Sequence, residues 1–125
     1  MAALGASATS KRTPKILAIG DVNLWRRSFG VLPVHQGIQF AGLDDLNGPA
    51  LSLACPDLIV SPIVTPLFDC IDVAFRLSAL HYSGAYRALT RDLPNPAMVR
   101  REVRALYPDL DFDIVHVLDD GVIRF

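Results

Sequence analysis

Short apolar runs, each followed by a small or polar residue, recur along this chain and restrict its fold more than any other feature. Three of them are Lys15–Asp21, Asp57–Ser61 and Ala85–Thr90. A strand that is apolar on both of its faces is buried on both, as happens in a parallel sheet covered by helices. We therefore expect the chain to form a sheet of this kind.

The segments between these runs have the spacing of amphipathic helices. The four helices that we expect are 22–31, 50–55, 67–82 and 97–106, and the two further strands are 38–42 and 111–118. Five strands that alternate with helices indicate a parallel sheet with helices on both faces. Right-handed crossovers then favour a doubly wound, flavodoxin-like α/β sandwich. We expect one domain over residues 15–125, preceded by a flexible tail over residues 1–14.

The chain has no room for a helix after its fifth strand, because only seven residues follow. The dipeptide Asp120-Gly121 lies between apolar stretches and is typical of a hairpin turn. We expect either a short antiparallel strand at 122–125 or an extended tail. A missing final helix would expose apolar sheet surface, which the tail or a second subunit would have to cover.

The segment 56–70 resembles the third strand and following loop of a receiver domain, the phospho-acceptor module of two-component response regulators. Five residues fall on matching positions of that motif, namely Pro56, Asp57, Leu58, Pro66 and Asp69. The resemblance covers about residues 15–90 and is strongest over residues 50–80. It implies the strand order 2-1-3-4-5.

The resemblance also implies that receiver chemistry has been lost. Pro62 stands where the family has its phospho-acceptor aspartate, and a proline ring has no carboxylate. Asp21 matches one of two acidic positions and Thr90 matches the strand-four hydroxyl, but no lysine follows Lys15. Asp21, Pro62 and Thr90 are thus the degenerate positions of the phospho-site. Asp21 also suits a helix N-cap, and Ser61, an alternative acceptor, lacks a visible base.

Three arginines gather on the fourth expected helix, where Arg100 and Arg104 are one turn apart and Arg101 is their neighbour. They form either a solvated helix face or a docking surface for an acidic protein partner. Trp25 and Phe29 lie one turn apart on the first helix. They are either core residues or the anchors of an interface.

Composition excludes several classes of function. The net charge is −1, so no bulk electrostatic attraction to nucleic acid or to an anionic membrane is expected, and no nucleic-acid-binding motif accompanies the arginines. No apolar run is long enough to span a bilayer and the N-terminus lacks a secretory signal, so we expect a cytoplasmic protein. We expect Cys55 and Cys70 to be free thiols. The three histidines lack metal-ligand spacing, and no phosphate-binding glycine motif is present, so no cofactor is expected.

Two functions of different classes follow. The first is a receiver-like signalling or regulatory adaptor that is not an enzyme, acts without phosphorylation, binds another protein and forms a homodimer. The second is a small-molecule-binding or catalytic α/β domain. Its site would lie at the carboxyl ends of the strands, where Asp21, Ser61 and Thr90 would line a crevice.

Overall fold

The computed structural model describes residues 14–92, 94–117 and 123–124. The tail expected at residues 1–14 therefore lies, apart from Pro14, outside the described residues. The elements in chain order are β1 (Ile16–Ile19), α2 (Val22–Phe29), β2 (Pro33–Val34), β3 (Ile38–Ala41), the 3-10 helix η1 (Leu43–Asp45), α3 (Gly48–Ala54), β4 (Leu58–Pro62), α4 (Cys70–Ala79), β5 (Ala85–Thr90), α5 (Pro96–Leu106), β6 (Asp111–His116) and β7 (Ile123–Arg124).

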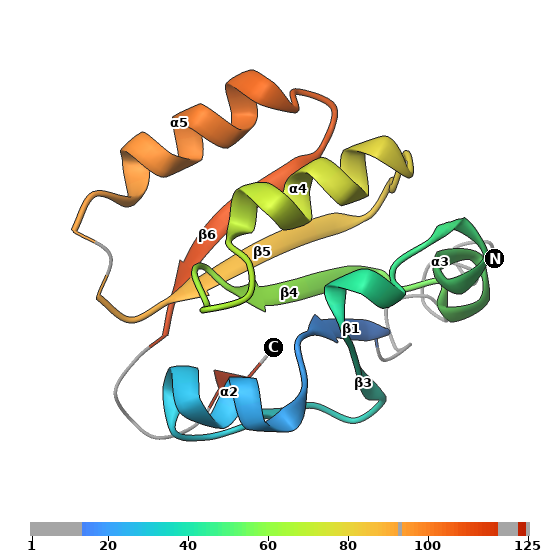
Figure 1. Ribbon diagram of the computed structural model, residues 1–125, viewed down its shortest axis with the longest axis horizontal. Helices are drawn as coiled ribbons and strands as arrows, with labels where there is room; N and C mark the ends of the chain where they lie inside the picture. Colours follow the sequence, from blue (N-terminus) through green and yellow to red (C-terminus); the bar gives the residue numbers. More distant parts are fainter. Residues whose placement is uncertain (1–13, 93, 118–122, 125) are drawn as a thin grey trace, which may run out of the picture.

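Five strands form one parallel sheet in the order β3-β1-β4-β5-β6 (Figure 1). Numbered along the chain, these five strands have the order 2-1-3-4-5, so the flavodoxin-like fold expected from the sequence is confirmed. Strand order reverses direction at β1, because the chain moves to β3 on one side and then to β4 on the other. The carboxyl ends of β1 and β4 therefore flank the switch point of the sheet.

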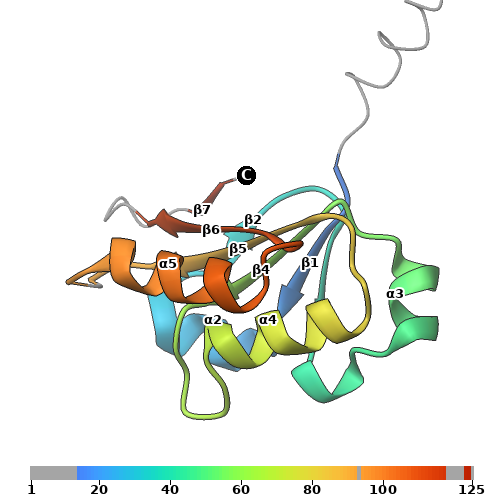
Figure 2. The same cartoon turned by 90° about the horizontal axis from the view of Figure 1, so that it is seen from above.

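Helices cover both faces of this sheet (Figures 1 and 2). One core cluster joins the sheet to α3, α4 and α5 and includes Val73, Leu77, Tyr86, Val103 and Phe112. The second cluster joins the opposite face to α2. Trp25 and Phe29 belong to it, and Trp25 is 0% exposed with its indole N–H donating to the Ile19 carbonyl at 3.1 Å. The structure thus assigns these two aromatic residues to the core.

The expected helix at 67–82 is shorter in the structure, and its capping residues explain why. The Asp69 carboxylate accepts hydrogen bonds from the N–H groups of Ile71 and Asp72, and the Asp72 carboxylate accepts one from the Asp69 N–H. This reciprocal cap begins α4 at Cys70. The preceding residues form a tight loop in which the Thr65 hydroxyl accepts hydrogen bonds from two backbone N–H groups.

Pro62 lies inside β4, although a proline is not expected in a central strand. Its partner on the β5 side is Leu89, and the next residue, Ile63, donates its N–H to the Leu89 carbonyl at 2.8 Å. Backbone groups alternate between the two neighbours of a strand, so the nitrogen of Pro62 faces the β1 side. Pairing with β1 has already ended at Val60. The proline therefore removes no hydrogen bond from the sheet.

The C-terminal segment differs from the expected antiparallel strand. β7 pairs with β2, and the two strands are parallel. An antiparallel hairpin with the last strand of the sheet is therefore wrong, and the chain returns instead to the segment that follows α2. Residues 118–122, which include the expected Asp120-Gly121 turn, and Phe125 lie outside the described residues. No helix follows β6 in the part of the chain that the structure describes.

Candidate functional site

Asp21 follows β1 and caps α2. Its carboxylate accepts a hydrogen bond from the Leu24 N–H at 2.8 Å, which is the N-cap arrangement that the sequence offered as an alternative. The chain reaches this cap through Gly20, whose φ of 111° favours glycine, and a Cβ there would lie 2.5 Å from the Leu24 side chain. One carboxylate oxygen is thus committed to the helix, while the side chain stays exposed.

Pro62 and Thr90 end two neighbouring strands, β4 and β5, and both side chains are buried. They line a hollow of ≈ 310 Å³ together with Phe29, Leu89 and Arg91. The Arg91 guanidinium donates a hydrogen bond to the Phe29 carbonyl at 2.6 Å, at the C-terminal end of α2. Asp21 does not line this hollow. The three degenerate positions are therefore divided between two surfaces.

Ser61 lies in the core and not in a crevice at the strand ends. It is fully buried, its hydroxyl lies 2.6 Å from the Tyr86 hydroxyl, and it donates to the Pro62 carbonyl at 2.9 Å. Burial raises the pKa of Tyr86 well above its usual range, so the phenol remains neutral and cannot act as a base for Ser61. The expectation that Asp21, Ser61 and Thr90 line one crevice is wrong.

A hollow of ≈ 550 Å³ lies at the switch point of the sheet. Residues after β1 and β3 line it, together with Leu67 and Phe68 of the loop before α4. The sequence analysis missed Asp44 and Asp45, which bring two further carboxylates to this hollow beside Asp21. An Asp-Asp pair within four residues of the end of a parallel strand is the signal that would have found them. The Asp45 carboxylate also accepts a hydrogen bond from the Gly42 N–H at 3.3 Å.

Neither thiol forms a catalytic arrangement with other described residues. Cys70 is 3% exposed, and burial, with the neighbouring Asp69 charge, raises the pKa of its thiol to about 12. Cys55 is exposed at the end of α3. Among the described residues, no group of three or more His, Cys, Asp or Glu side chains could hold a metal ion.

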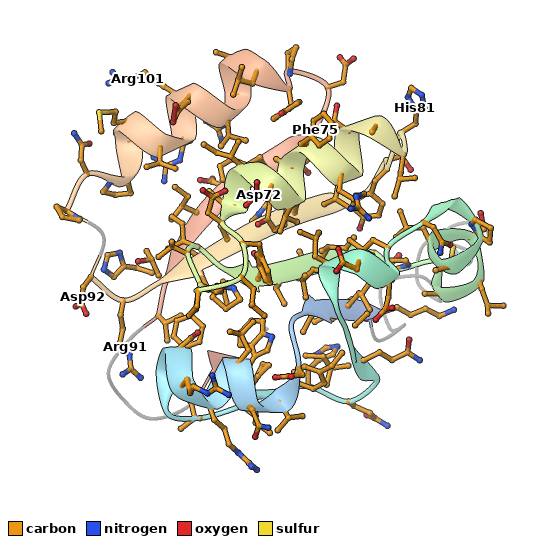
Figure 3. All side chains as sticks on the ribbon, in the orientation of Figure 1. Asp72, Phe75, His81, Arg91, Asp92 and Arg101 are labelled. Carbon is orange, nitrogen blue, oxygen red and sulfur yellow. The ribbon has the colours of Figure 1, made fainter. Side chains whose placement is uncertain are left out.

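The structure divides the three arginines of α5. Arg100 donates to the Asp113 carboxylate at 2.6 Å, and Arg104 donates to the Phe112 carbonyl at 3.0 Å and pairs with Asp113 at 3.6 Å. The same carboxylate accepts the N–H of Ile114 at 2.7 Å. Arg101 points away from α4 into solvent (Figure 3) and forms no ion pair with any described residue.

These contacts protect part of the free edge of β6, the last strand of the sheet. An exposed strand edge offers unpaired N–H and C=O groups to another strand, and here side chains satisfy two of them. Burial raises the pKa of Asp113, but the hydrogen bonds from Ile114 and Arg100 and the charges of both arginines outweigh it, so the pKa falls below its ordinary value. Arg100 and Arg104 thus already serve the fold, and docking by Arg101 stays a prediction.

The comparisons with known proteins add little to this geometry. No protein-family model matches the sequence, and no curated protein matches it. Among solved structures, the chain is similar to the N-terminal domain of an uncharacterized protein from Wolinella succinogenes. The two are 14% identical with a TM-score of 0.47, and the match covers 84% of this chain and 81% of that chain. At this distance the likeness says nothing about function, and the fold is established by the strand order.

None of the helices in the described part of the chain is both long enough and apolar enough to cross a bilayer.

Proposed function

We propose that this protein is a receiver-like adaptor that has lost phosphoryl transfer and acts by binding proteins, including a second copy of itself. The observation that carries the proposal is the side chain at the end of β4. Pro62 lies there with less than 2% of its side chain exposed, at the position where the resemblance implies a phosphorylated aspartate. Nothing at that position can form an acyl phosphate.

The surrounding residues support the same proposal. Asp21 uses one carboxylate oxygen to cap α2, and the hydroxyl of Ser61, the residue before Pro62, points into the core. No lysine follows Lys15 in the sequence. Mg²⁺ is usually held by one or two carboxylates together with phosphate oxygens. Without the acceptor aspartate, the site lacks both that carboxylate and a phosphoryl group as ligands. A cytoplasmic location and a signalling role belong to this proposal.

The hollow at the switch point favours a second candidate, the binding of a small molecule. Ligands of open α/β sheets bind outside the carboxyl ends of the strands at such a point, and the hollow has a volume within the range of ligand pockets. A thermal-shift series with nucleotides, acyl phosphates and Mg²⁺ separates the two candidates. A bound ligand raises the melting temperature with concentration, whereas the adaptor proposal predicts no shift.

Intact-mass spectrometry after incubation with acetyl phosphate and Mg²⁺ tests the adaptor proposal. The expected result is an unchanged mass. A stoichiometric adduct of one phosphate, labile to hydroxylamine, would show an aspartyl phosphate and overturn the proposal. The matched control is the Asp21→Asn variant, whose mass should be equally unaffected by the treatment.

A further inference from the structure

An apolar seam runs along the outer surface of the helical layer, between α4 and α5. Phe75 is 60% exposed, and Met98 and Leu106 are each 55% exposed. On α5, Met98, Glu102 and Leu106 are spaced by four residues and share one stripe of the helix. Because Arg100 and Arg104 turn toward β6, this stripe lies on the side of α4.

Contacts between the two helices show how the seam is assembled. The rings of Phe75 and Tyr107, which are 32 positions apart in the sequence, lie 6.5 Å apart. The charge of Glu102 contributes to the raised pKa of the Cys70 thiol, so these two residues, again 32 positions apart, lie near each other. The two helices α4 and α5 therefore run side by side in the same direction. Figures 1 and 2 show this parallel arrangement, and Figure 3 places Phe75 between the two helices.

Opposite charges flank the seam on its two sides. Asp72 is exposed on α4 and Arg101 is exposed on α5, on the side away from α4 (Figure 3). Asp72 also accepts the Asp69 N–H, but neither Asp72 nor Arg101 forms an ion pair within the described residues. Residues of α4 lie beside residues of α5 that come 32 positions later, so Asp72 lies at the same height along the helices as position 104. That is about one helical turn from Arg101, a distance that an arginine side chain can span.

We infer that this seam binds a second copy of the chain through a two-fold axis that runs along it. Rotation about that axis places α4 of one protomer over α5 of its partner. The apolar side chains then meet at the centre, while Asp72 of each protomer meets Arg101 of the partner subunit on the two flanks. A surface with opposite charges on its two sides and apolar residues between them is complementary to itself, as an isologous interface requires. The exposed Glu102, which lies between Met98 and Leu106 on the same stripe, also approaches the axis, so the two Glu102 carboxylates of a dimer repel each other and weaken the pairing.

The expected contact is small. The ten residues of α4 make a helix of about 15 Å, so the buried area lies at the low end of specific interfaces and the dimer should have a micromolar dissociation constant. The net charge of −1 offers no long-range repulsion to oppose it. This inference rests on the self-association included in the proposed function and names the surface that produces it.

Sedimentation equilibrium of the full chain over the micromolar range tests the apolar centre. Phe75→Glu and Leu106→Glu each place two charges in the desolvated centre of the interface, and we expect the dissociation constant to rise about a hundredfold. Leu53→Glu is the matched control, because Leu53 is 89% exposed on α3 and lies outside the seam. It should leave self-association unchanged. Circular dichroism checks that each variant is folded.

A charge exchange tests the symmetry of the pairing. Arg101→Glu and Asp72→Lys each turn both flanking pairs into repulsive ones, so each variant should dimerise about tenfold more weakly than the wild type. An equimolar mixture of the two variants should dimerise again, because a mixed dimer contains two attractive pairs. Asp72→Lys also removes a capping contact of α4. If it does not fold, Arg101→Glu alone still tests the flank, because its weakening should diminish as salt rises.

Three results would overturn the inference: a wild-type protein that stays monomeric at high micromolar concentration, a dimer that survives both Phe75→Glu and Leu106→Glu, or folded charge variants whose mixture does not recover. None of these results tests whether the protein has lost phosphoryl transfer. The acetyl phosphate experiment tests that part of the proposed function separately.

Discussion

Replacing Pro62 by aspartate tests whether the end of β4 is packed core or a usable site. The substitution restores the type of side chain that the receiver resemblance implies at this position. In this protein it places a carboxylate where less than 2% of the side chain is exposed, next to Leu89 and Ile63. A strand end built for phosphoryl chemistry would accept the charge, whereas a packed one would not.

The size of the effect follows from desolvation. A carboxyl group in such surroundings has its pKa raised by about three units, which corresponds to roughly 4 kcal/mol of lost stability at neutral pH. The raised pKa destabilises the folded state in full at any pH above the folded-state pKa. The penalty then declines as the pH falls toward about 4, the value in the unfolded chain. Pro62→Asn matches the shape of aspartate and carries no charge, so it isolates the charge from the loss of the ring.

Urea unfolding of both variants at pH 7 and at pH 5 provides the measurement. We expect Pro62→Asp to be several kcal/mol less stable than Pro62→Asn at pH 7, with the gap narrowing at pH 5. Equal stability of the two variants at pH 7 would show that the end of β4 is solvated, and would refute the reasoning that it is closed to chemistry.

Three further predictions concern other parts of the molecule. Asp113→Asn should destabilise the protein by about 1 kcal/mol near neutral pH, because Asp113 is 41% exposed but holds three partners. Since the folded pKa of Asp113 is lowered, this contribution is present above about pH 4 and disappears as the pH falls further, so urea melts of the two proteins should converge in acid. Iodoacetamide at pH 8 should alkylate Cys55 and spare Cys70 in the native protein, and peptide mapping that finds Cys70 labelled at the same rate would contradict its burial and raised pKa. Tyr86→Phe should cost about 1 kcal/mol, and a double-mutant cycle with Ser61→Ala should show coupling; additive losses would mean that the two hydroxyls do not interact.

The sheet could be predicted from the sequence because its strands are apolar on both faces. Ala85–Thr90 was expected with the bounds that the structure shows, and Asp21 was recognised as a suitable cap. The ends of α4 were misplaced, because an apolar periodicity continues through Leu67 while the cap at Asp69 and Asp72 decides where the helix begins. The pairing of β7 with β2 joins residues about 90 positions apart, and local turn signals carry no information about such a long-range contact.

The candidate site was harder to predict than the fold. Sequence position placed Ser61 at a strand end, but the alternation of side chains turned it toward Tyr86 in the core. The arginines of α5 looked like one basic face, and only the edge position of β6 shows that Arg100 and Arg104 are held by Asp113. Asp44 and Asp45 were overlooked because they follow a strand with no recognised motif. In each case the decisive partner is distant in sequence.

The central claim is that this protein works through its helical surface and not through the ends of its strands. Amide spectra of the ¹⁵N-labelled protein test both parts in one sample. Dilution through the micromolar range should move the amide signals of Asp72, Phe75 and Leu106, whereas Mg²⁺ with acetyl phosphate should leave those of Asp21, Ser61 and Thr90 in place. Shifts at the strand ends with acetyl phosphate, and none on α4 and α5 with dilution, would contradict the account.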